Sequence, residues 1–492
     1  MKSSTGKILE RIPASGTCFS VVAVLVILNC LLLGFQISSN AGRYESTWWL
    51  ASAPPMACTN ASFALDEKLN MSSIDLSKGE VRSFRAHGVA SRLIIEVGSY
   101  RNGPRTFSSV VMTSKLLNEL HDITHECEWV TSDSKALRVK AMAIKPDWNM
   151  GRLYGTMVLV CNFPRDVGTD AEGGQMILTA GYSDSYRIPE RFVALTEMRG
   201  EYSASHFQQP YSYDLAFCGS PLYGNISPQR VREWIAYHAW FFGNRTLFMF
   251  HDAGGIHDDV YRVLKPWIDL GRVQVQNLRQ AEVYEGYYHH QFTILNDCLM
   301  RSQTLASWTF FFDIDEYLYI PEAHSPRAIL NLLAEQARNN VTQILFKNIK
   351  ISDALCEKSN KTTTEAQSMA KQSRKWAFEK LVYADCNYGW EPVESRKYAL
   401  QPQLVWATGV HYSEHLKQGH YITMDPTVLR SYHYHNTLNG RWETCKDFPQ
   451  HPNGGPNSVN VTNCTTDHAM LSFAPAVKSY ELATIGEQPF LL

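Results

Sequence analysis

Two aspartates separated by a single residue follow an unusually apolar run in the second half of the 492-residue chain. The segment from Trp308 to Glu316 reads WTFFFDIDE, so aromatic side chains lead directly into three acids. Consecutive apolar residues predict a strand buried on both faces, where unpaired carboxylates would be costly. Because side chains alternate along a strand, Asp313 and Asp315 are expected on one side, with Ile314 turned into the core.

Two neighbouring carboxylates repel each other unless a cation lies between them. Carboxylate oxygens suit hard cations such as Mn²⁺ or Mg²⁺, which often complete their coordination with substrate phosphates. We therefore predict that Asp313 and Asp315 hold a divalent metal, which would neutralise the charge developing on a nucleoside diphosphate leaving group. The alternative is a charged strand end that enters solvent, and the α/β pattern around the acids favours the metal.

Strand and helix patterns alternate through residues 206–492, which we predict to form one folded domain. Such alternation indicates a mainly parallel, Rossmann-like α/β sheet with helices on both faces. Ligands then bind outside the carboxyl ends of the strands. The pair Ser227-Pro228 predicts the start of the first helix. Strands are expected over residues 213–218, 246–252, 273–278 and 308–320, and helices over 228–243, 258–271 and 289–306.

Residues 83–205 contain short runs rich in Val, Ile and Tyr between turn residues, which predict an antiparallel β-sandwich. Trp129, Trp148, Tyr154 and Tyr182 are candidates for a sugar-binding face there, although core packing is the commoner role of such side chains. A module of this kind would hold a polymeric substrate near the catalytic site. Its deletion is then expected to shorten the products while leaving transfer to short acceptors intact.

The N-terminal end predicts a membrane anchor. Residues 18–36 are almost continuously apolar and long enough to span a bilayer, and the tail of residues 1–17 carries three basic residues against one acid. Positive charge stays cytoplasmic, so the rest of the chain is expected in the lumen. A cleaved signal peptide is the alternative, but the apolar run is long and its cleavage context is poor. Residues 37–82, rich in Ser, Ala, Asn and Pro, predict a stem.

Glycosylation and cysteine patterns agree with a luminal location. Eight Asn-x-Ser/Thr sequons occur, and nine of the 11 cysteines follow the predicted anchor at wide spacings. Such cysteines fit disulfides in an oxidising compartment better than metal knuckles. The net charge of -2 gives no electrostatic basis for binding nucleic acid, so no nucleic acid is expected as a partner.

Three segments together resemble glycosyltransferase family 92. They are FFFDIDEYL at residues 310–318, CGSPLYGN…REWIAYH within residues 218–238, and ATGVH…LRSYHYHN within residues 407–436. Within that family the chain is most similar to the plant galactan synthases, which are β-1,4-galactosyltransferases of pectin. The resemblance covers essentially the whole chain, including a β module similar to a carbohydrate-binding domain.

The resemblance implies a GT-A fold with UDP-galactose as donor and Mn²⁺ as cofactor. It also implies β-1,4-galactan or a galacto-oligosaccharide as acceptor, and inversion at the anomeric carbon. The location it implies is the Golgi membrane, with a single-pass type II topology. By analogy with other Golgi transferases, a homodimer is expected.

A GT-A fold also implies a late histidine as the third metal ligand, for which there are three candidates. His433 and His435 lie two residues apart, so a strand would place both on one side. His433 best matches the family pattern and ranks first, ahead of His435. His411 is the third candidate, and a hydrogen-bonded core histidine is an equally good interpretation of it.

An inverting enzyme of this fold needs a general base, which is normally an Asp or Glu between the D-x-D and the late histidine. The candidates are Asp385, Glu391 and Glu394. We favour Glu391, because Trp390 beside it can stack on the acceptor and raise the carboxylate pKa by desolvation. A surface acid in a loop is the alternative interpretation.

The expected donor-contact residues are Ser220, Pro221, Tyr223, His251, Asp252, Asp313 and Ile314. The first three follow the first strand of the domain, where the nucleotide usually lies in this fold. The next two end the second strand, and the last two belong to the D-x-D. Arg396 and Lys397 are interpreted as a solvated basic pair rather than as phosphate ligands.

Three other functions remain as alternatives. The first is transfer of a related sugar such as arabinopyranose, because a pocket seldom rejects a smaller isostere strongly. The second is a non-catalytic carbohydrate-binding or scaffold protein, which the retained D-x-D argues against. The third is a glycosidase, which needs a carboxylate pair flanking the sugar and no metal.

Overall fold

A computed structural model describes part of the chain. The described residues are 79–88, 94–114, 123–146, 153–182, 188–284, 286–321, 326–352, 375–384, 396–435, 437–438 and 464–488. The chain divides into two compact units, Met1–Ser73 and Ile74–Leu492, and every described residue lies in the second. The predicted cytoplasmic tail, the anchor and most of the predicted stem lie outside the described residues. Within these residues, no helix is long and apolar enough to cross a membrane.

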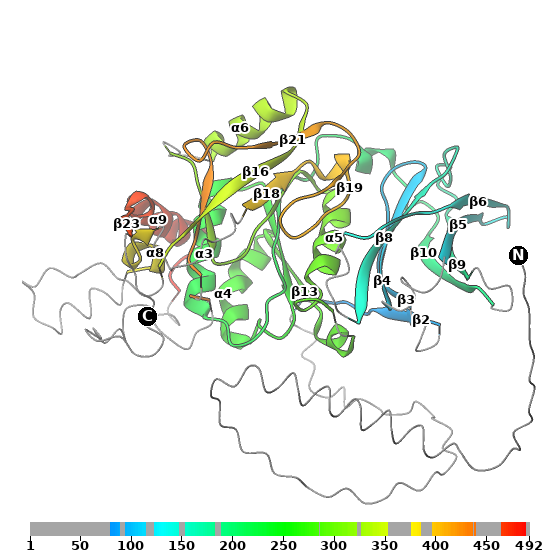
Figure 1. The fold of residues 1–492 in the computed structure, drawn as a ribbon, viewed down its shortest axis with the longest axis horizontal. Helices are drawn as coiled ribbons and strands as arrows, with labels where there is room; N and C mark the ends of the chain where they lie inside the picture. Colours follow the sequence, from blue (N-terminus) through cyan, green and yellow to red (C-terminus); the bar gives the residue numbers. More distant parts are fainter. Residues whose placement is uncertain are drawn as a thin grey trace, which may run out of the picture. The chain divides into compact units, whose positions relative to one another are not determined.

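A ten-stranded sheet forms the centre of the described region (Figure 1). Its strand order is β1-β13-β12-β11-β14-β18-β16-β22-β15, and β21 also pairs with β16. The strands from β1 to β14 in this order run parallel, as predicted. In contrast, β18 is antiparallel to both of its neighbours, and β15 is antiparallel to β22. The sheet is therefore mixed. Beyond β14 it is extended by β15, whose residues lie within the strand predicted over 308–320, and by four strands that the sequence pattern did not predict, namely β16, β18, β21 and β22.

The bounds of these strands are β1 (Glu80–Val81), β11 (Tyr213–Cys218), β12 (Thr246–Asp252), β13 (Val273–Asn277), β14 (Ala306–Phe311), β15 (Glu316–Tyr319), β16 (Val341–Lys350), β18 (Arg396–Leu400), β21 (His420–Thr423) and β22 (Arg430–His433). Strand β1 uses residues that the sequence placed at the end of the stem, so this part of the chain is integrated into the sheet. Two small sheets pair β17 (Tyr383–Ala384) with β23 (Thr465–Thr466) and β19 (Val405–Ala407) with β20 (His415–Leu416).

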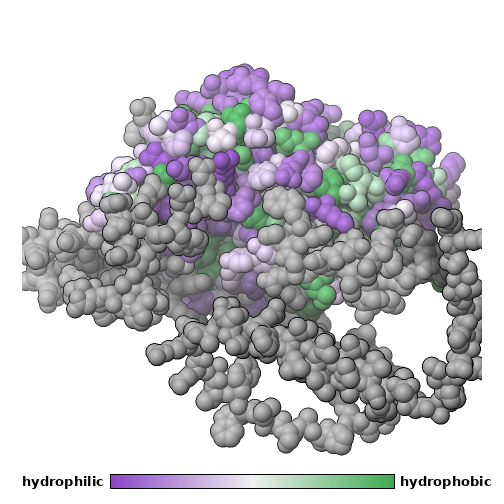
Figure 2. Space-filling view, in the orientation of Figure 1, coloured by the Kyte–Doolittle hydropathy of each residue, from purple (hydrophilic) through white to green (hydrophobic). Residues whose placement is uncertain are grey.

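Helices cover both faces of the central sheet (Figure 1). They are α3 (Pro228–Phe242), α4 (Asp258–Asp269), α5 (Gln291–Ser302), α6 (Arg327–Arg338), α8 (Ala377–Lys380) and α9 (Ala474–Ile485). The side chains of β11 show the division, because Phe217 packs in one core cluster with α3 and α4 whereas Ala216 packs in another with α5. Helix α6 buries Ile329 and Leu333, and hydrophilic residues cover its outer side at the top of Figure 2.

Helix α3 begins as predicted. The Ser227 hydroxyl accepts a hydrogen bond from the Arg230 amide at 3.4 Å, and Pro228 is the first helical residue. Helix α5 is shorter than predicted at both ends, because it spans Gln291–Ser302 rather than residues 289–306. A non-helical turn precedes it and takes part in the site described below.

Two antiparallel sheets lie N-terminal to the central sheet. The first has the order β2-β3-β4-β8-β7 and the second β10-β9-β5-β6. Their bounds are β2 (Arg85–His87), β3 (Ile94–Arg101), β4 (Thr106–Ser114), β5 (Ile123–Thr131), β6 (Ala136–Lys140), β7 (Met142–Ile144), β8 (Tyr154–Asn162), β9 (Gly174–Tyr182) and β10 (Glu190–Glu197). The two sheets share a core cluster, and the Cys127–Cys161 disulfide joins β5 of one sheet to β8 of the other.

The candidate sugar-binding aromatics are only partly accessible. Trp129 is 1% exposed and stacks on Phe107, so it belongs to the core. The Tyr154 ring meets Tyr284 edge-on at a centroid distance of 5.9 Å. Trp148 and the Tyr182 side chain lie outside the described part of the chain. The prediction that Trp129 forms part of an aromatic sugar-binding face is therefore wrong.

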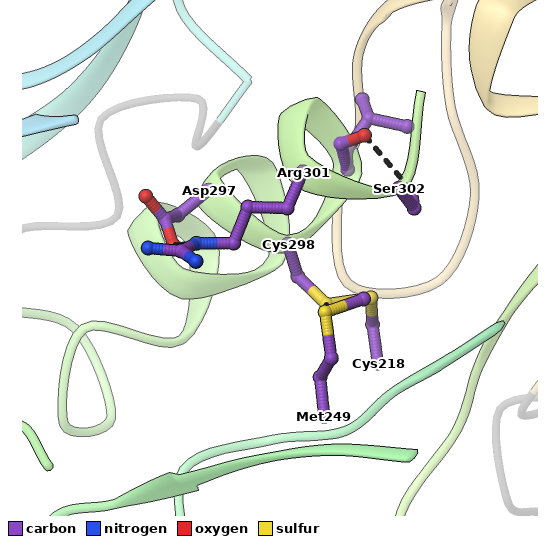
Figure 3. The surroundings of a disulfide bond; sticks show 7 residues. Cys218, Met249, Asp297, Cys298, Arg301 and Ser302 are labelled. Carbon is purple, nitrogen blue, oxygen red and sulfur yellow. Dashed lines mark hydrogen bonds and ion pairs between the residues drawn. A yellow bond between two sulfur atoms is a disulfide. The ribbon is translucent and has the colours of Figure 1, made fainter. Parts of the chain in front are cut away.

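The five-stranded sheet also packs on helix α5 and shares a core cluster with the central sheet. The Thr156 and Thr293 hydroxyls are 2.7 Å apart, and Arg82 forms a buried ion pair with Asp297 at 2.9 Å. On the other side of α5, a disulfide joins Cys298 to Cys218 at the end of β11 (Figure 3). Helix α5 is thus fixed between the five-stranded sheet and the central sheet.

Candidate active site

The apolar run and its acids do not form one strand. Strand β14 ends at Phe311 and β15 begins at Glu316, so Asp313 and Asp315 lie in the connecting turn. The prediction of a continuous strand over 308–320 is therefore wrong. The Glu316 carboxylate accepts a hydrogen bond from the Asp313 amide at 2.8 Å, and this contact reverses the chain. Ile314 is nevertheless 3% exposed and lies in the core, as predicted.

Glu316 is the internal support of this turn. Its side chain is fully buried, and Asn348 Nδ2 donates a hydrogen bond to its second carboxylate oxygen at 2.5 Å. Burial raises the pKa of Glu316 to about 7, although the neighbouring Lys397 opposes this effect. The sequence shows this acid but gives no hint of its structural role.

Asp313 is held from two sides. The Ser220 hydroxyl donates a hydrogen bond to Oδ1, and the Lys397 ammonium lies 2.6 Å from Oδ2. Gln291, at the start of α5, donates to the Ser220 hydroxyl at 2.6 Å. Burial opposes ionisation, but Lys397 and Ser220 lower the pKa of the Asp313 carboxyl to about 2. Asp313 is therefore a fixed, ionised carboxylate at neutral pH.

Lys397 and Gln291 are site residues that sequence reasoning missed. Lys397 is 5% exposed and also lies 3.5 Å from a Glu316 oxygen, so its interpretation as a solvated cation is wrong. The only signal in the sequence RKYAL is that three apolar residues follow Lys397, because the residue before it is the charged Arg396. Gln291 offered no signal, since its role depends on where α5 begins.

Asp315 faces the late histidine. The β15–β22 pairing places Glu316 opposite His433, and this register brings His433 Nε2 to 3.4 Å from Asp315 Oδ2. Burial lowers the pKa of His433, but the interaction with Asp315 outweighs it and the pKa is raised. The His435 ring lies perpendicular to that of His433 at 5.1 Å. His411 is elsewhere, with Nδ1 3.2 Å from the Arg396 carbonyl oxygen.

These groups surround a cavity of about 250 Å³. Its lining includes carboxylates, imidazoles and one hydroxyl, together with aromatic and aliphatic side chains. The lining residues are Ser220, Pro221, Leu222, Tyr223, Ile226, Tyr288, Asp313, Ile314, Asp315, His433, His435 and Leu438. Because β11 and β14 are parallel neighbours, the segments after their carboxyl ends meet here. The structure thus brings together eight of the sequence-predicted site residues.

Other predicted site residues are not part of this cavity. His251 and Asp252 are fully buried at the end of β12. The Asp252 carboxylate accepts from the amides of Gly254 and Ile256 at 2.9 Å each, and from Arg279 at 2.9 Å. These contacts shape the following loop, so the prediction that Asp252 contacts the donor is not supported by the geometry.

The three candidate bases, Asp385, Glu391 and Glu394, lie outside the described residues. A larger cavity of about 500 Å³ lies between β3, β10 and the C-terminal end of α5. None of the predicted site residues lines it. The smaller cavity is the better candidate for an active site, because it holds the fixed carboxylate, the Asp315–His433 pair and the end of the parallel strands.

The donor types at the cavity fit a divalent metal. Asp315 and His433 both line it and approach each other, and His433 Nδ1 is buried without a hydrogen-bond partner among the described residues. Across those same residues, no three His, Cys, Asp or Glu side chains converge on one point. Two protein ligands suffice for Mn²⁺ or Mg²⁺ when substrate phosphates and waters complete the coordination. Both carboxylate oxygens of Asp313 already have protein partners, which are Ser220 at Oδ1 and Lys397 at Oδ2.

Sequence comparison assigns the class of enzyme. The family model of glycosyltransferase family 92 matches residues 213–467, which extend from β11 to β23 and include both aspartates and all three histidines. The chain belongs to glycosyltransferase family 92 and is a glycosyltransferase.

Three relatives from Arabidopsis thaliana are similar over most of their length. Galactan beta-1,4-galactosyltransferase GALS1 is 40% identical over 408 residues, covering 82% of this chain and 79% of the relative. Galactan beta-1,4-galactosyltransferase GALS2 is 39% identical, over 83% of this chain and 77% of the relative. Galactan beta-1,4-galactosyltransferase GALS3 is 34% identical, over 96% of this chain and 93% of the relative.

Proposed function

We propose that the chain transfers galactose from UDP-galactose to the non-reducing end of β-1,4-galactan, with inversion and with Mn²⁺ or Mg²⁺ as cofactor. The galactosyl group and the galactan acceptor follow from the names of three relatives that are similar over most of their length. The observation that carries the proposal is one cavity whose lining combines carboxylates and imidazoles with aromatic side chains. This combination matches a nucleotide-sugar, which has a charged diphosphate and a flat base.

In this proposal Asp315 and His433 hold the metal, with His435 next to them. A metal held there would supply positive charge that offsets the negative charge building up on the UDP leaving group. Lys397 and Ser220 keep Asp313 ionised and immobile, so that it can orient the donor in the cavity. A fixed group of this kind needs no reorganisation when the reaction occurs.

The general base of the proposed reaction is an acid from the segment before β18, with Glu391 first and Glu394 and Asp385 as alternatives. It removes the proton from the 4-hydroxyl of the terminal acceptor galactose as that oxygen attacks the anomeric carbon. The bond from the anomeric carbon to the diphosphate breaks in the same displacement, which inverts the configuration. Inversion therefore yields the β-linkage from an α-linked donor.

The location of the enzyme is also part of the proposal. Residues 18–36 anchor it in the Golgi membrane with residues 1–17 in the cytoplasm, and the catalytic part lies in the lumen as a homodimer. The sequons and the disulfides Cys127–Cys161 and Cys218–Cys298 support an oxidising compartment. Pectin synthesis is the process in which such an activity extends galactan side chains.

A transfer assay with the full chain in detergent tests the proposal. The chain is incubated with a panel of UDP-sugars and a galacto-oligosaccharide, with Mn²⁺ or with EDTA. We expect galactose transfer that EDTA abolishes. Asp315→Asn is expected to lower kcat by about 100-fold or more, since it removes a charge that acts on the leaving group. The control is Asp269→Asn, at an exposed position on α4, which should be fully active. A fully active Asp315→Asn variant would overturn the metal assignment.

A further inference from the structure

Three consecutive residues before helix α5 have left-handed backbone conformations. Tyr288, His289 and His290 have φ values of 46°, 54° and 66°. Among the described residues six non-glycine residues have positive φ, and half of them are concentrated in this one turn. Side chains make this region unfavourable for every residue except glycine, and a bulky ring increases the cost. A run of three is therefore maintained by its surroundings.

The surroundings that maintain this turn are visible around His290. Its side chain is 2% exposed, and its Nε2 lies 3.1 Å from the Ala281 carbonyl oxygen. Its ring also meets Phe84 edge-on at 5.8 Å. A Cβ atom at position 286 would approach His290 Nδ1 to 2.0 Å, so only glycine fits at Gly286. The base of the turn is thus locked in the protein interior.

The exposed part of the turn faces the candidate active site. Tyr288 lines the same cavity as Asp313 and Asp315, and its side chain is 49% exposed. Tyr223, which follows β11, donates a hydrogen bond to the Tyr288 hydroxyl at 2.6 Å. The two rings meet edge-on at 5.4 Å, and His289 stacks on Tyr223 at 4.1 Å. The left-handed turn therefore builds an aromatic wall that a helical start at His289 would not build.

Backbone strain of this kind is concentrated at functional sites, where it keeps a side chain in a position that a relaxed chain would leave. We propose that the turn of residues 287–290 is a donor-binding element, in which Tyr288 and Tyr223 hold the nucleoside of the nucleoside diphosphate. This inference rests on the proposed function. Aromatic faces stack well on a nucleobase, and Asp315 and His433 line the same cavity. The hydroxyl of Tyr288 accepts from Tyr223, which leaves its own proton for a ligand oxygen.

The inference predicts opposite effects on stability and on binding for Tyr288→Gly. Glycine adopts positive φ without cost, so the melting temperature of the full chain should stay the same or rise. The loss of the ring should weaken UDP binding in the presence of Mn²⁺ by about tenfold, the size of one base–aromatic contact. Isothermal titration with UDP measures this directly, without turnover. Tyr288→Phe keeps the ring and should weaken binding much less.

Ser134→Gly is the matched control. Ser134 also has positive φ, at 65°, but it lies in the hairpin between β5 and β6, away from the cavity. Ser134→Gly should remove a similar backbone strain and leave UDP binding unchanged. In turnover assays Tyr288→Gly should raise KM for UDP-galactose and leave KM for the galacto-oligosaccharide unchanged.

Several outcomes would overturn the inference. Unchanged UDP affinity in Tyr288→Gly would do so, as would a higher KM for the acceptor alone. A lower melting temperature in Tyr288→Gly, with UDP affinity lost equally in Tyr288→Phe, would assign the ring a structural role. These results differ from failure of the proposed function, in which the unmodified chain itself binds no UDP and transfers no sugar.

Discussion

The two N-terminal sheets bury their apolar residues in different ways. The four-stranded sheet packs on its neighbour around Trp129, whereas the five-stranded sheet has buried residues on both faces. One face carries Met157 and meets the four-stranded sheet. The opposite face carries Met112 and shares a core with helix α5 and the central sheet. The composition of the sequence changes near residue 205, but one core cluster contains residues from both sides of this position.

The largest expected effect is that of deleting residues 79–205. Without the five-stranded sheet, the apolar surface that it covers around α5 would be exposed to solvent, and Asp297 would lose one of its two arginine partners, Arg82, and keep Arg301. Exposure of such an apolar surface favours aggregation. We therefore expect an aggregated or unfolded product, which circular dichroism and gel filtration would detect. A soluble, active chain that makes shorter products would show instead that the sheets are a separable polymer-holding module, as the sequence predicts.

A matched pair of core substitutions sharpens the comparison. Met112 and Met157 are 1% and 2% exposed and occupy opposite faces of the same sheet. Substitution of either methionine by Ala should lower the free energy of unfolding by about 2–5 kcal/mol. Met112→Ala should also lower kcat/KM at a temperature where both variants are folded. The space left by the removed side chain adjoins helix α5, which carries Gln291. Equal activities of the two variants would mean that α5 does not transmit packing changes to the site.

The smallest of the three effects concerns pH. Burial lowers the pKa of His238 and His251 in the catalytic region to about 3, and that of His125 in the four-stranded sheet to about 4. The ordinary value is 6.5, so below that pH the unfolded chain binds protons that the folded chain does not. The stability that these neutral, buried histidines contribute is therefore fully present above pH 6.5, and it is lost as the pH falls towards their pKa values in the folded protein.

For His251 the expected loss between pH 6.5 and about pH 5 is about 2 kcal/mol, at about 1.4 kcal/mol per pH unit. Urea unfolding at both pH values measures it. His251→Gln should remove this part of the acid sensitivity, while His206→Gln, at an exposed position, should leave it unchanged. If His251→Gln loses as much stability in acid as the unmodified chain, His251 does not remain neutral in the folded protein.

The parts of the fold that depend on local patterns were predictable. Apolar periodicity and the positions of turn and capping residues predict helix α3, with its Ser227 cap, and strands β11 to β13. The break between β14 and β15 was not predictable, because it depends on Glu316 accepting the Asp313 amide inside the protein. The pattern of an apolar run followed by acids is the same in one continuous strand and in two strands joined by a turn.

The candidate site shows the same distinction. Asp313, Asp315 and His433 were identified because their types and order carry the chemistry, and the structure places them around one cavity. Lys397 was misinterpreted, since only the pairing of β18 between β14 and β16 brings its ammonium to Asp313. The left-handed turn at Tyr288 opposes the helical pattern of its own sequence and could not be predicted.

The Cys218–Cys298 disulfide has a consequence for the order of events during synthesis. Its cysteines (Figure 3) lie 80 positions apart in the sequence, and the segment between them includes α3, β12, α4 and β13. The bond joins the end of β11, which supplies Ser220, to the helix that supplies Gln291. A growing chain can thus close this bond only after three strand–helix repeats have been synthesised. Its closure would restrain the segments that supply Ser220 and Gln291 to the candidate site at the same time.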